Sequence, residues 1–429
     1  SIATNAGAAG TTVENFGVGS SVTIQGRKAI IDPTSDLTGG ETYHISYPSG
    51  AFTNTSGDVS YVGTAYTFGV KPVFNQLWAW SNNSDGALGQ NNETKYSSPV
   101  QIPGTTWSTL GISSKMTLGT KSDGTLWSWG ANNEGRLGLN NTTKYSSPVQ
   151  IPGTIWSQAF QGHEMNAALR NDGTLWSWGT NTAGQLGQND TTKYSSPTQI
   201  PGTNWATYHG SRNAIATKTD GTLWIWGQNS HGNLGLNQPD NIHFSSPTQI
   251  PGTTWGTTKG KLGGSHYSSF AIKTDGTLWA WGDGNQGVLA NNDGSTDYSS
   301  PIQIPGTNWS KIISGGYSMM AIKTDGTLWT WGAGSDGQLG DSNKANRSSP
   351  IQIPGTTWSG GGAFYQAFRA VKTDGTMWAW GANHDGNLAQ NDSAPSAARS
   401  SPIQIPGTTW TLDNITGYRV SRGFAFKEV

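Results

Sequence analysis

Histidine and carboxylate side chains are the groups of this sequence best suited to bind metals or transfer protons. The seven histidines fall at unrelated positions of the chain, and no two have the spacing of a zinc-binding helix. They are His44, His163, His209, His231, His243, His266 and His384. Cysteine is absent, which excludes disulfides, thiolate metal sites and thiol nucleophiles. The sequence therefore predicts no bound metal and no cofactor.

One acidic segment, residues 293–297, has carboxylates that could supply oxygen ligands to calcium. It lacks the alternating Asp or Asn residues and the closing Glu of an EF-hand loop, so we interpret it as a turn. Glycine-rich loops are frequent, but none follows the Gly-x-x-x-x-Gly-Lys-Ser/Thr pattern that cradles phosphates. Paired catalytic carboxylates are not evident either, and we predict that the protein is not an enzyme.

The elements that would position any site are tandem repeats. The tetrapeptide Leu-Trp-x-Trp, with one Met variant, begins at residues 77, 126, 175, 223, 278, 328 and 377. A second motif, Pro-Gly-Thr-x-Trp, ends at residues 107, 156, 205, 255, 309, 358 and 410. Together the two motifs account for all 21 tryptophans of the chain. A tryptophan that recurs at a fixed place in a repeat indicates a packed core rather than a stacking surface for ligands.

The two tryptophans of each Leu-Trp-x-Trp strand lie two residues apart and point to the same face of the strand. We therefore expect them to fill the wedge between neighbouring sheets. The predicted structural core includes Trp127, Trp129, Trp176, Trp178, Trp224, Trp226, Trp279, Trp281, Trp329 and Trp331.

Each repeat, about 50 residues long, contains four short β-prone runs. An Asp-Gly pair such as Asp275-Gly276 separates an Ala-Ile-Lys run from the Leu-Trp-x-Trp run, which predicts a type I′ turn with positive φ at both residues. Prolines on both sides of the Ser-Ser-Pro-x-Gln-Ile-Pro run suit a short strand at the outer edge. Four strands in each of seven repeats predict an all-β, seven-bladed β-propeller over residues 71–429.

The first and last repeats show how this ring closes. Leu77 is not preceded by an Ala-Ile-Lys strand, whereas residues 421–427 have the pattern of that strand. We expect the C-terminal strand to pair beside residues 77–80. One blade would then contain both ends of the propeller, and no sheet edge would stay open.

The motif Asp-Gly-Thr-Leu-Trp-x-Trp-Gly followed by x-x-x-Gly-x-Leu-Gly, as in residues 172–187, resembles the repeat of the RCC1 family. The chain does not resemble WD40 repeats, which end in Trp-Asp, or kelch repeats, which carry a Gly-Gly pair. The resemblance implies a seven-bladed propeller. It also implies several functions: nucleotide exchange on a small GTPase with chromatin binding, inhibition of β-lactamase, ultraviolet sensing, and structural roles in bacterial and phage surface proteins. The Gly-Trp-Arg-His-Thr motif of the ultraviolet sensors is absent, and the uniform repeats are most similar to those of the bacterial and phage proteins.

Residues 1–70 lack the repeat and form a separate β module. Residues 22–33 predict a hairpin, and the segment from Gly40 to Phe52 resembles the later part of a bacterial Ig-like domain, a small β-sandwich. The opening strands of such a domain are not recognisable. Three explanations stay open: a processed chain, a reduced sandwich, or completion by a strand from a neighbouring molecule.

The repeats differ most in the segment that enters each Ala-Ile-Lys strand, which we expect at the start of the innermost strands near the mouth of the channel. These segments gather Tyr, His, Arg and Phe, which are frequent at binding hot spots. The candidate ligand-binding rim consists of His163, Arg212, His266, Tyr267, Tyr317, Phe364, Tyr365 and Arg419. Drift at tolerant loop positions is the alternative explanation. The variable linkers 239–244, 293–298 and 393–399 offer a second candidate surface.

Charge argues against several partner classes. Lys and Arg number 25 and Asp and Glu 26, so the formal net charge is −1, which does not favour a nucleic-acid partner. No apolar run is long enough to insert into a membrane. We predict a non-enzymatic structural or adhesive protein, extracellular and displayed on a virion or bacterial cell surface, with the N-terminal module as its anchor. Its partners would be copies of itself, other virion or surface subunits in a particle or filament, or a host receptor or glycan. The alternatives are a soluble propeller that binds one protein ligand and a carbohydrate-binding lectin.

Overall fold

The computed structural model describes residues 75–113, 115–392, 398–412, 415–417 and 422–428, and only the strands within residues 1–74. The chain forms two compact units, Ser1–Phe74 and Asn75–Val429, each described here by itself. In the described part of the chain no helix has the length and apolar character needed to span a bilayer.

The N-terminal unit contains two antiparallel sheets. One has the strand order β2-β1-β5-β6, formed by β1 (Ile2–Thr4), β2 (Thr12–Glu14), β5 (Thr42–Ile45) and β6 (Tyr66–Gly69). The other is a hairpin of β3 (Val22–Gln25) and β4 (Lys28–Ile31), in which Gln25 pairs with Lys28. This confirms the hairpin expected in residues 22–33. The likeness to an Ig-like sandwich stays a prediction, because most residues of the unit lie outside the described ones.

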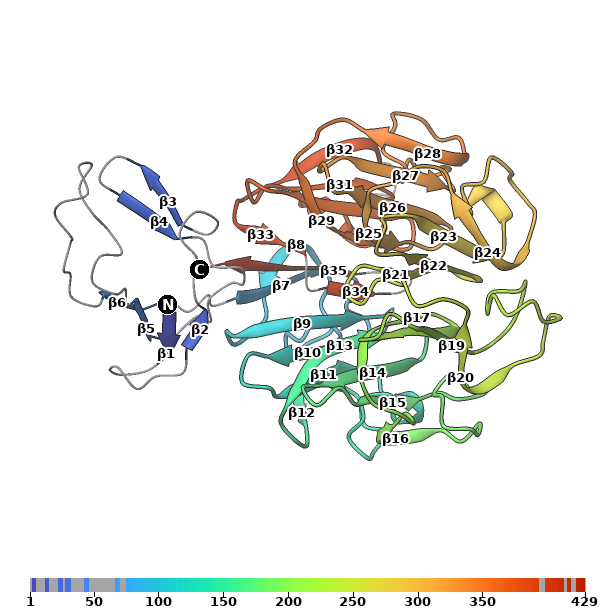
Figure 1. The fold of residues 1–429 in the computed structure, drawn as a ribbon, viewed down its shortest axis with the longest axis horizontal. Helices are drawn as coiled ribbons and strands as arrows, with labels where there is room; N and C mark the ends of the chain where they lie inside the picture. The colour runs from blue at the N-terminus through green and yellow to red at the C-terminus, as the bar shows by residue number, and fades with distance from the viewer. Residues whose placement is uncertain are drawn as a thin grey trace, which may run out of the picture. The chain divides into compact units, whose positions relative to one another are not determined.

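The second unit is a propeller of seven sheets, each built on four antiparallel strands, and the first sheet has a fifth, parallel strand (Figure 1). This confirms the all-β, seven-bladed architecture. Blades 1 to 6 are formed by β9–β12, β13–β16, β17–β20, β21–β24, β25–β28 and β29–β32. Blade 7 has the strand order β33-β35-β7-β8.

The innermost strand of a blade starts at or just after the tryptophan of the Pro-Gly-Thr-x-Trp motif. From β9 to β29 these strands contact their counterparts in neighbouring blades, and β34 contacts both β29 and β9, so that together they surround the channel. They are β9 (Trp107–Ile112), β13 (Trp156–Gln161), β17 (Trp205–Gly210), β21 (Leu262–Gly264), β25 (Trp309–Ser314), β29 (Trp358–Ala363) and β33 (Trp410–Thr411). A further short strand, β34 (Ile415–Gly417), pairs in parallel with β9.

The second strand of each blade carries the Ala-Ile-Lys pattern. The expectation that this strand is innermost is therefore wrong, because the strand that follows Pro-Gly-Thr-x-Trp takes that place. The second strands are β10 (Met116–Lys121), β14 (Met165–Arg170), β18 (Asn213–Lys218), β22 (Ser268–Ile272), β26 (Ser318–Lys323), β30 (Ala367–Lys372) and β35 (Arg422–Glu428).

The third strand carries the Leu-Trp-x-Trp motif, and the fourth strand lies at the outer edge as its prolines predict. The third strands are β11 (Leu126–Gly130), β15 (Leu175–Gly179), β19 (Leu223–Gly227), β23 (Leu278–Gly282), β27 (Leu328–Gly332), β31 (Met377–Gly381) and β7 (Asn75–Ser81). The outer strands are β12 (Tyr145–Ile151), β16 (Tyr194–Gln199), β20 (Phe244–Ile250), β24 (Tyr298–Ile304), β28 (Arg347–Ile353), β32 (Arg399–Ile405) and β8 (Tyr96–Gln101). The loops between third and outer strands contain 3₁₀ turns at η1 (Asn133–Gly135), η2 (Asn285–Gly287) and η3 (His384–Gly386).

The Asp-Gly turns between second and third strands differ from the predicted type I′ turn. Gly276 has φ +78°, but Asp275 is not among the residues with positive φ. The Gly276 N–H donates to the Lys273 carbonyl at 3.0 Å, and the Lys273 N–H donates to Thr277 at 2.9 Å. This is a three-residue loop with a bulge at the glycine. Asp275 keeps negative φ because its carboxylate accepts hydrogen bonds from the backbone N–H and the hydroxyl of Thr277, at 2.9 and 2.7 Å.

Tryptophan packing holds the blades together. Trp129 is fully buried and belongs to a cluster with Leu77, Ile102 and Phe424 of the preceding blade. Its indole N–H also donates to the Ala87 carbonyl of that blade at 2.8 Å. The same inter-blade bond, at 2.8–3.1 Å, is made by Trp80, Trp129, Trp178, Trp226, Trp281, Trp331 and Trp380. The second tryptophan of each pair therefore lies in the predicted wedge.

The first tryptophan of each pair also packs against a core cluster but is only partly buried, so only the second is fully enclosed in the wedge. These residues are Trp78, Trp127, Trp176, Trp224, Trp279, Trp329 and Trp378. Each packs against the border of a core cluster.

The C-terminal strand closes the ring, as expected. β35 pairs antiparallel with β7, with Gly423 opposite Trp80 and Phe426 opposite Leu77 (Figure 1). Phe424 and Phe426 are buried in the cluster that includes Leu77.

Candidate functional site

The hairpins that join innermost to second strands lie on one face of the propeller, which we call the rim face. The loops that follow the third strands reach the same face: the Ala131 N–H donates to the Lys115 carbonyl at 2.9 Å, and the Asp283 N–H donates to the Tyr267 carbonyl at 2.9 Å. The variable residues picked out in the sequence belong to these hairpins. They border the end of the channel, although the strands they enter are the second ones.

Backbone hydrogen bonds join neighbouring hairpins of the rim face. The His163 N–H donates to the Ser211 carbonyl at 3.0 Å, which links blades 2 and 3. The His266 N–H donates to the Gly316 carbonyl at 3.3 Å, and the Gly316 N–H donates to the Tyr365 carbonyl at 3.3 Å. Blades 4, 5 and 6 therefore present a continuous surface.

Five aromatic or cationic side chains meet at this surface, four of them partly exposed and His266 7% exposed, in a group that we call the rim cluster. The Tyr267 ring lies 4.5 Å from the ring of His266 and 5.1 Å from that of His231. The Arg212 guanidinium lies 5.1 Å from the centre of the Tyr267 ring. His266 also stacks on Tyr317, with ring centres 5.5 Å apart and planes inclined by 15°. Sequence reasoning identified four of these residues and missed His231.

The other predicted rim residues have different surroundings. Phe364 is 1% exposed and lies in the core beneath the Arg369 guanidinium, so it is a packing residue and not part of the surface. Tyr365 lies against Gly316, where an added Cβ would be 2.6 Å from its ring. His163 is half-buried in the hairpin of blade 2. Arg419 lies outside the described residues.

His231 also joins the rim cluster to two carboxylates. Its Nδ1 lies 2.8 Å from Oδ2 of Asp297. Asp283, which is 3% exposed, completes a group whose potential ligand atoms all lie within 4.8 Å of one another. Two carboxylates and an imidazole are suitable ligands for a divalent cation. Without one, His231 pairs with Asp297, and Asp283 accepts a hydrogen bond from the Asn285 N–H at 2.9 Å.

The predicted turn in residues 293–297 is present. Asp293 accepts a hydrogen bond from the Ser295 N–H at 3.0 Å, and Asp297 accepts one from the Gly284 N–H at 3.0 Å. The turn thus delivers the Asp297 carboxylate to His231 of the preceding blade.

Comparison of the blade junctions provides the signal that could have identified His231. In two other junctions the loop carries the acidic residue, and the outer strand of the next blade begins after a lysine. Glu134 pairs with Lys193 at 2.6 Å in this way, and Asp385 pairs with Lys95. At the junction of blades 3 and 4 the order is reversed, with His231 in the loop and Asp297 before the strand.

The opposite face carries a different repeated arrangement. The Lys273 ammonium lies 4.2 Å from the centre of the Trp279 ring and 4.9 Å from that of Trp255. The Trp279 N–H donates to the Thr277 hydroxyl at 3.0 Å. A cation lies over both tryptophans in every blade: Lys121, Arg170, Lys218, Lys273, Lys323, Lys372 and Lys427. These rings already interact with cations, which weakens the lectin alternative.

Five segments of the chain match the family model of the Regulator of chromosome condensation (RCC1) repeat, at residues 123–169, 172–208, 220–266, 275–322 and 325–359. The chain is an RCC1-repeat propeller. The Leu-Trp-x-Trp copies that begin at residues 77 and 377 lie outside the matched segments, on either side of the point where the ring closes.

Solved structures share the RCC1-repeat fold. Human WBSCR16 has a TM-score of 0.68 and 19% identity, over 82% of this chain and 98% of that chain. Prp20p from Saccharomyces cerevisiae has a TM-score of 0.72 and 17% identity, over 83% of this chain and 92% of that chain. The yeast RCC1 (Prp20) bound to Kap60 gives a TM-score of 0.72 and 18% identity, over 83% and 89% of the two chains. At these identities the likeness establishes the fold alone. No curated protein matches this RCC1-repeat sequence.

Proposed function

We propose that this RCC1-repeat propeller is a non-enzymatic protein-binding module whose partner docks on the rim cluster. The observation that carries the proposal is the convergence of Arg212, His231, His266, Tyr267 and Tyr317 from three neighbouring blades. Tyrosine and arginine are enriched at energetic hot spots of protein interfaces because they combine a large contact area with hydrogen-bonding groups.

The structural neighbours support a protein partner in general terms. Prp20p is described by its binding to Gsp1p and histones, and it has also been solved bound to Kap60. The formal net charge of −1 gives the present chain no strong overall field toward either a basic or a polyanionic partner. Recognition would therefore depend on the shape and aromatic content of the rim cluster.

We further propose display on a virion or bacterial cell surface, for which the uniform repeats and low charged content are the support. The competing proposal is a soluble propeller that binds one protein ligand. The native mass of the protein in undisrupted source material separates the two. A particle or filament supports display, and a monomer near the 45.4 kDa of the chain supports the soluble regulator.

Capture of partners by the full chain from its source material tests the rim cluster. The variant Tyr267→Ala, Tyr317→Ala and Tyr365→Ala removes two rings of the rim cluster and the ring of Tyr365 on the same rim face. It should lose at least about tenfold in affinity for the partner that the wild type captures, since tyrosines are frequent hot-spot side chains. A matched control changes three exposed threonines of the opposite face: Thr253→Ala, Thr307→Ala and Thr356→Ala. Equal affinity of the tyrosine variant and the wild type, with both folded, would place the binding site elsewhere.

A further inference from the structure

Three side chains of metal-ligating type converge at the junction of blades 3 and 4. His231 lies in the loop after β19, Asp283 directly follows β23, and Asp297 directly precedes β24. A potential ligand atom of each lies within 4.8 Å of those of the other two, and Nδ1 of His231 is 2.8 Å from Oδ2 of Asp297. Atoms that bind one ion at about 2.0–2.4 Å lie at most about 4.8 Å apart, so small side-chain movements would bring all three to one ion.

Asp283 has an incomplete set of hydrogen bonds for a buried carboxylate. The residue is 3% exposed, and its Oδ1 accepts a hydrogen bond from the Asn285 N–H at 2.9 Å. Within the described residues no donor binds its Oδ2, and the neighbouring His231 is already paired with Asp297. A buried carboxylate is costly unless donors or a cation compensate it. The unsatisfied oxygen therefore indicates a ligand for a cation.

Other blades have uncharged residues at the position of Asp283. They are Asn82, Ala131, Thr180, Gln228, Ala333 and Ala382. The Thr180 hydroxyl, for example, donates to Glu134, which also pairs with Lys193 at 2.6 Å. That junction thus combines one acid, one neutral donor and one lysine, and its charges balance.

The same three positions at the junction of blades 3 and 4 hold His231, Asp283 and Asp297. Two carboxylates replace the neutral donor and the lysine, and a histidine replaces the acid. A further carboxylate, that of Asp240, accepts a hydrogen bond at 2.9 Å from the N–H of Gly232, the residue after His231. In the described part of the chain no lysine or arginine forms an ion pair with any of these carboxylates. The junction therefore has an excess of negative charge that a divalent cation would neutralise.

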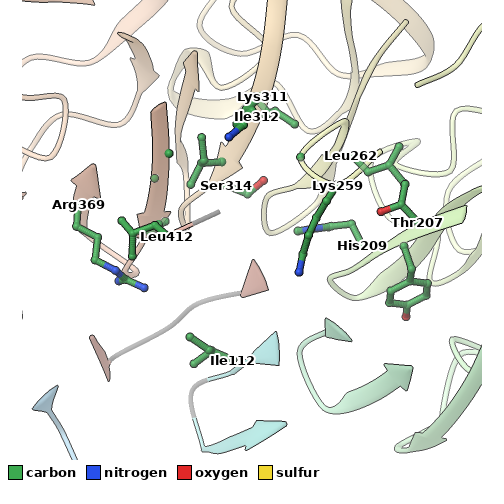
Figure 2. Close-up of a pocket in the computed structure, with 17 residues that line it drawn as sticks. Ile112, Thr207, His209, Lys259, Leu262, Lys311, Ile312, Ser314, Arg369 and Leu412 are labelled. Atoms are coloured by element: carbon green, nitrogen blue, oxygen red, sulfur yellow. The ribbon is translucent and has the colours of Figure 1, made fainter. Parts of the chain in front are cut away.

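The channel does not offer a comparable set of ligands for a cation. Figure 2 shows its cavity, of about 80 Å³, with His209 and Arg369 among the lining residues. Arg369 is buried at a position where other blades have buried apolar residues, such as Ile215 and Met320. None of the described residues that line the cavity carries a carboxylate, and none belongs to the group at the junction of blades 3 and 4.

We propose that His231, Asp283 and Asp297 bind one divalent transition-metal ion, such as Zn²⁺ or Mn²⁺, at the junction of blades 3 and 4. A set of one imidazole and two carboxylates suits such ions, whereas Ca²⁺ and Mg²⁺ prefer oxygen ligands alone. Three protein ligands leave at least one coordination position for water. The proposal departs from the sequence-based expectation of no metal, because its ligands come from separate segments up to 66 residues apart. It does not depend on a protein partner at the rim cluster.

Titration of the metal-free full chain with Zn²⁺ and with Mn²⁺ tests the site. Isothermal titration calorimetry measures the affinity, and thermal unfolding measures the stabilisation. We expect an ion at about a hundredfold excess over its dissociation constant to raise the wild-type midpoint by about 3–5 °C.

Each ligand can be replaced by the residue that another blade has at the same position, so the variants should fold. The variants are His231→Gln, Asp283→Ala and Asp297→Asn, and the corresponding residues are Gln286, Ala333 and Asn346. Gln286 has φ +62°, close to the +60° of His231. Asn346 accepts a hydrogen bond from the Gly334 N–H at 3.0 Å, as Asp297 does from the Gly284 N–H.

Each of the three variants should lower the affinity for Zn²⁺ or Mn²⁺ at least about tenfold, since the loss of a ligand costs no less than a change in the groups that orient ligands. Glu134→Gln is the matched control, because it removes a carboxylate from the equivalent position of blade 1, and it should keep the wild-type affinity.

Three outcomes would overturn the proposal. The first is a wild type that binds neither Zn²⁺ nor Mn²⁺. The second is equal affinity of the wild type and Asp283→Ala for both ions, which would place any bound ion elsewhere in the chain. The third is stabilisation by Ca²⁺ but not by Zn²⁺ or Mn²⁺, which would exclude the His231 imidazole as a ligand.

Discussion

At the scale of single residues, tryptophans of the same repeat differ in what they contribute. Trp331 is fully buried, and its N–H donates across the blade junction to the Val288 carbonyl at 2.8 Å. Trp329, two residues earlier, is partly exposed and bonds within its own blade to the Thr327 hydroxyl at 2.9 Å. Trp331 thus joins two blades, whereas Trp329 covers the edge of one.

Trp331→Phe should lower the free energy of unfolding by about 1–3 kcal/mol, because it leaves a cavity and removes the inter-blade hydrogen bond. Trp329→Phe, the matched change outside the junction, should cost less. Urea denaturation of both variants measures the difference. A larger loss for Trp329→Phe would mean that the junction tryptophans are not the main link between blades.

His231 makes the rim cluster sensitive to pH. Partial burial acts to lower its pKa, but the hydrogen bond to Asp297 and the charges of Asp283, Asp297 and Asp240 outweigh burial and raise it above 6.5. A raised pKa means that the folded state holds the proton more tightly than the unfolded state. The resulting stabilisation is complete below pH 6.5 and is lost as the pH rises through the pKa of the folded protein.

The variant His231→Gln tests this effect. The thermal midpoint of the wild type should exceed that of the variant by more at pH 5.5 than at pH 8.5. Midpoints measured across this range give the comparison, and a constant difference between the two proteins would show that His231 does not change protonation with folding.

At the scale of elements, glycines with positive φ set the distance between blades. Gly138 has φ +72°, and a Cβ there would lie 2.7 Å from Nε1 of Trp178 in the next blade. Two blades have alanine at the equivalent position, Ala290 and Ala389, with φ of 53° and 54°. The loop therefore accepts a methyl group only together with a strained backbone.

Gly138→Ala should destabilise the protein by about 1–2 kcal/mol, since alanine is strained at this φ and its methyl group presses on the indole. Gly294→Ala is the matched control, because nothing lies within 4 Å of a Cβ there, and we expect a change within about 0.5 kcal/mol. Chemical denaturation measures the free energy of unfolding of both variants. If Gly138→Ala had the stability of the wild type, the junction between blades would be able to widen without a loss of stability.

Sequence periodicity was sufficient to predict the strands, the places of the third and outer strands in each blade, and the closure of the ring. It predicted the wrong innermost strand and the wrong turn, because both depend on interactions that a repeat pattern does not contain. The Asp275 turn is decided by a side-chain bond to Thr277. In the candidate site, Tyr267 and His266 were recognisable as variable aromatic positions, whereas Phe364 turned inward to support Arg369. Comparison of equivalent positions in different blades is needed to recognise two features. One is Arg369, which replaces an apolar residue, and the other is the reversed order of charges at His231 and Asp297.

At the scale of the whole molecule, blade 7 takes its four antiparallel strands from two distant parts of the chain. Arg422 of β35 is fully buried there, donates to the Asn82 carbonyl at 2.9 Å and lies 3.4 Å from the Asp85 carboxylate. Phe424 and Phe426 add buried apolar area on the same strand.

A chain that ends at residue 421 should lose cooperative unfolding or show a midpoint at least about 10 °C lower, because it loses these buried groups and exposes two sheet edges. A chain that lacks only residue 429 is the control and should unfold as the wild type does. If the shorter chain unfolded at the wild-type temperature, β35 would not be needed for closure.

The register of blade 7 also places the two ends of the propeller unit side by side, with Glu428 opposite Asn75. A short linker could therefore join these ends, and the chain could be opened instead between two strands of another blade, such as β19 and β20 of blade 3. The circularly permuted propeller would keep every blade and its inter-blade hydrogen bonds, and its seam would move to blade 3. The position of the seam thus depends on where the propeller segment of a chain starts, and the closed ring itself has no fixed first blade.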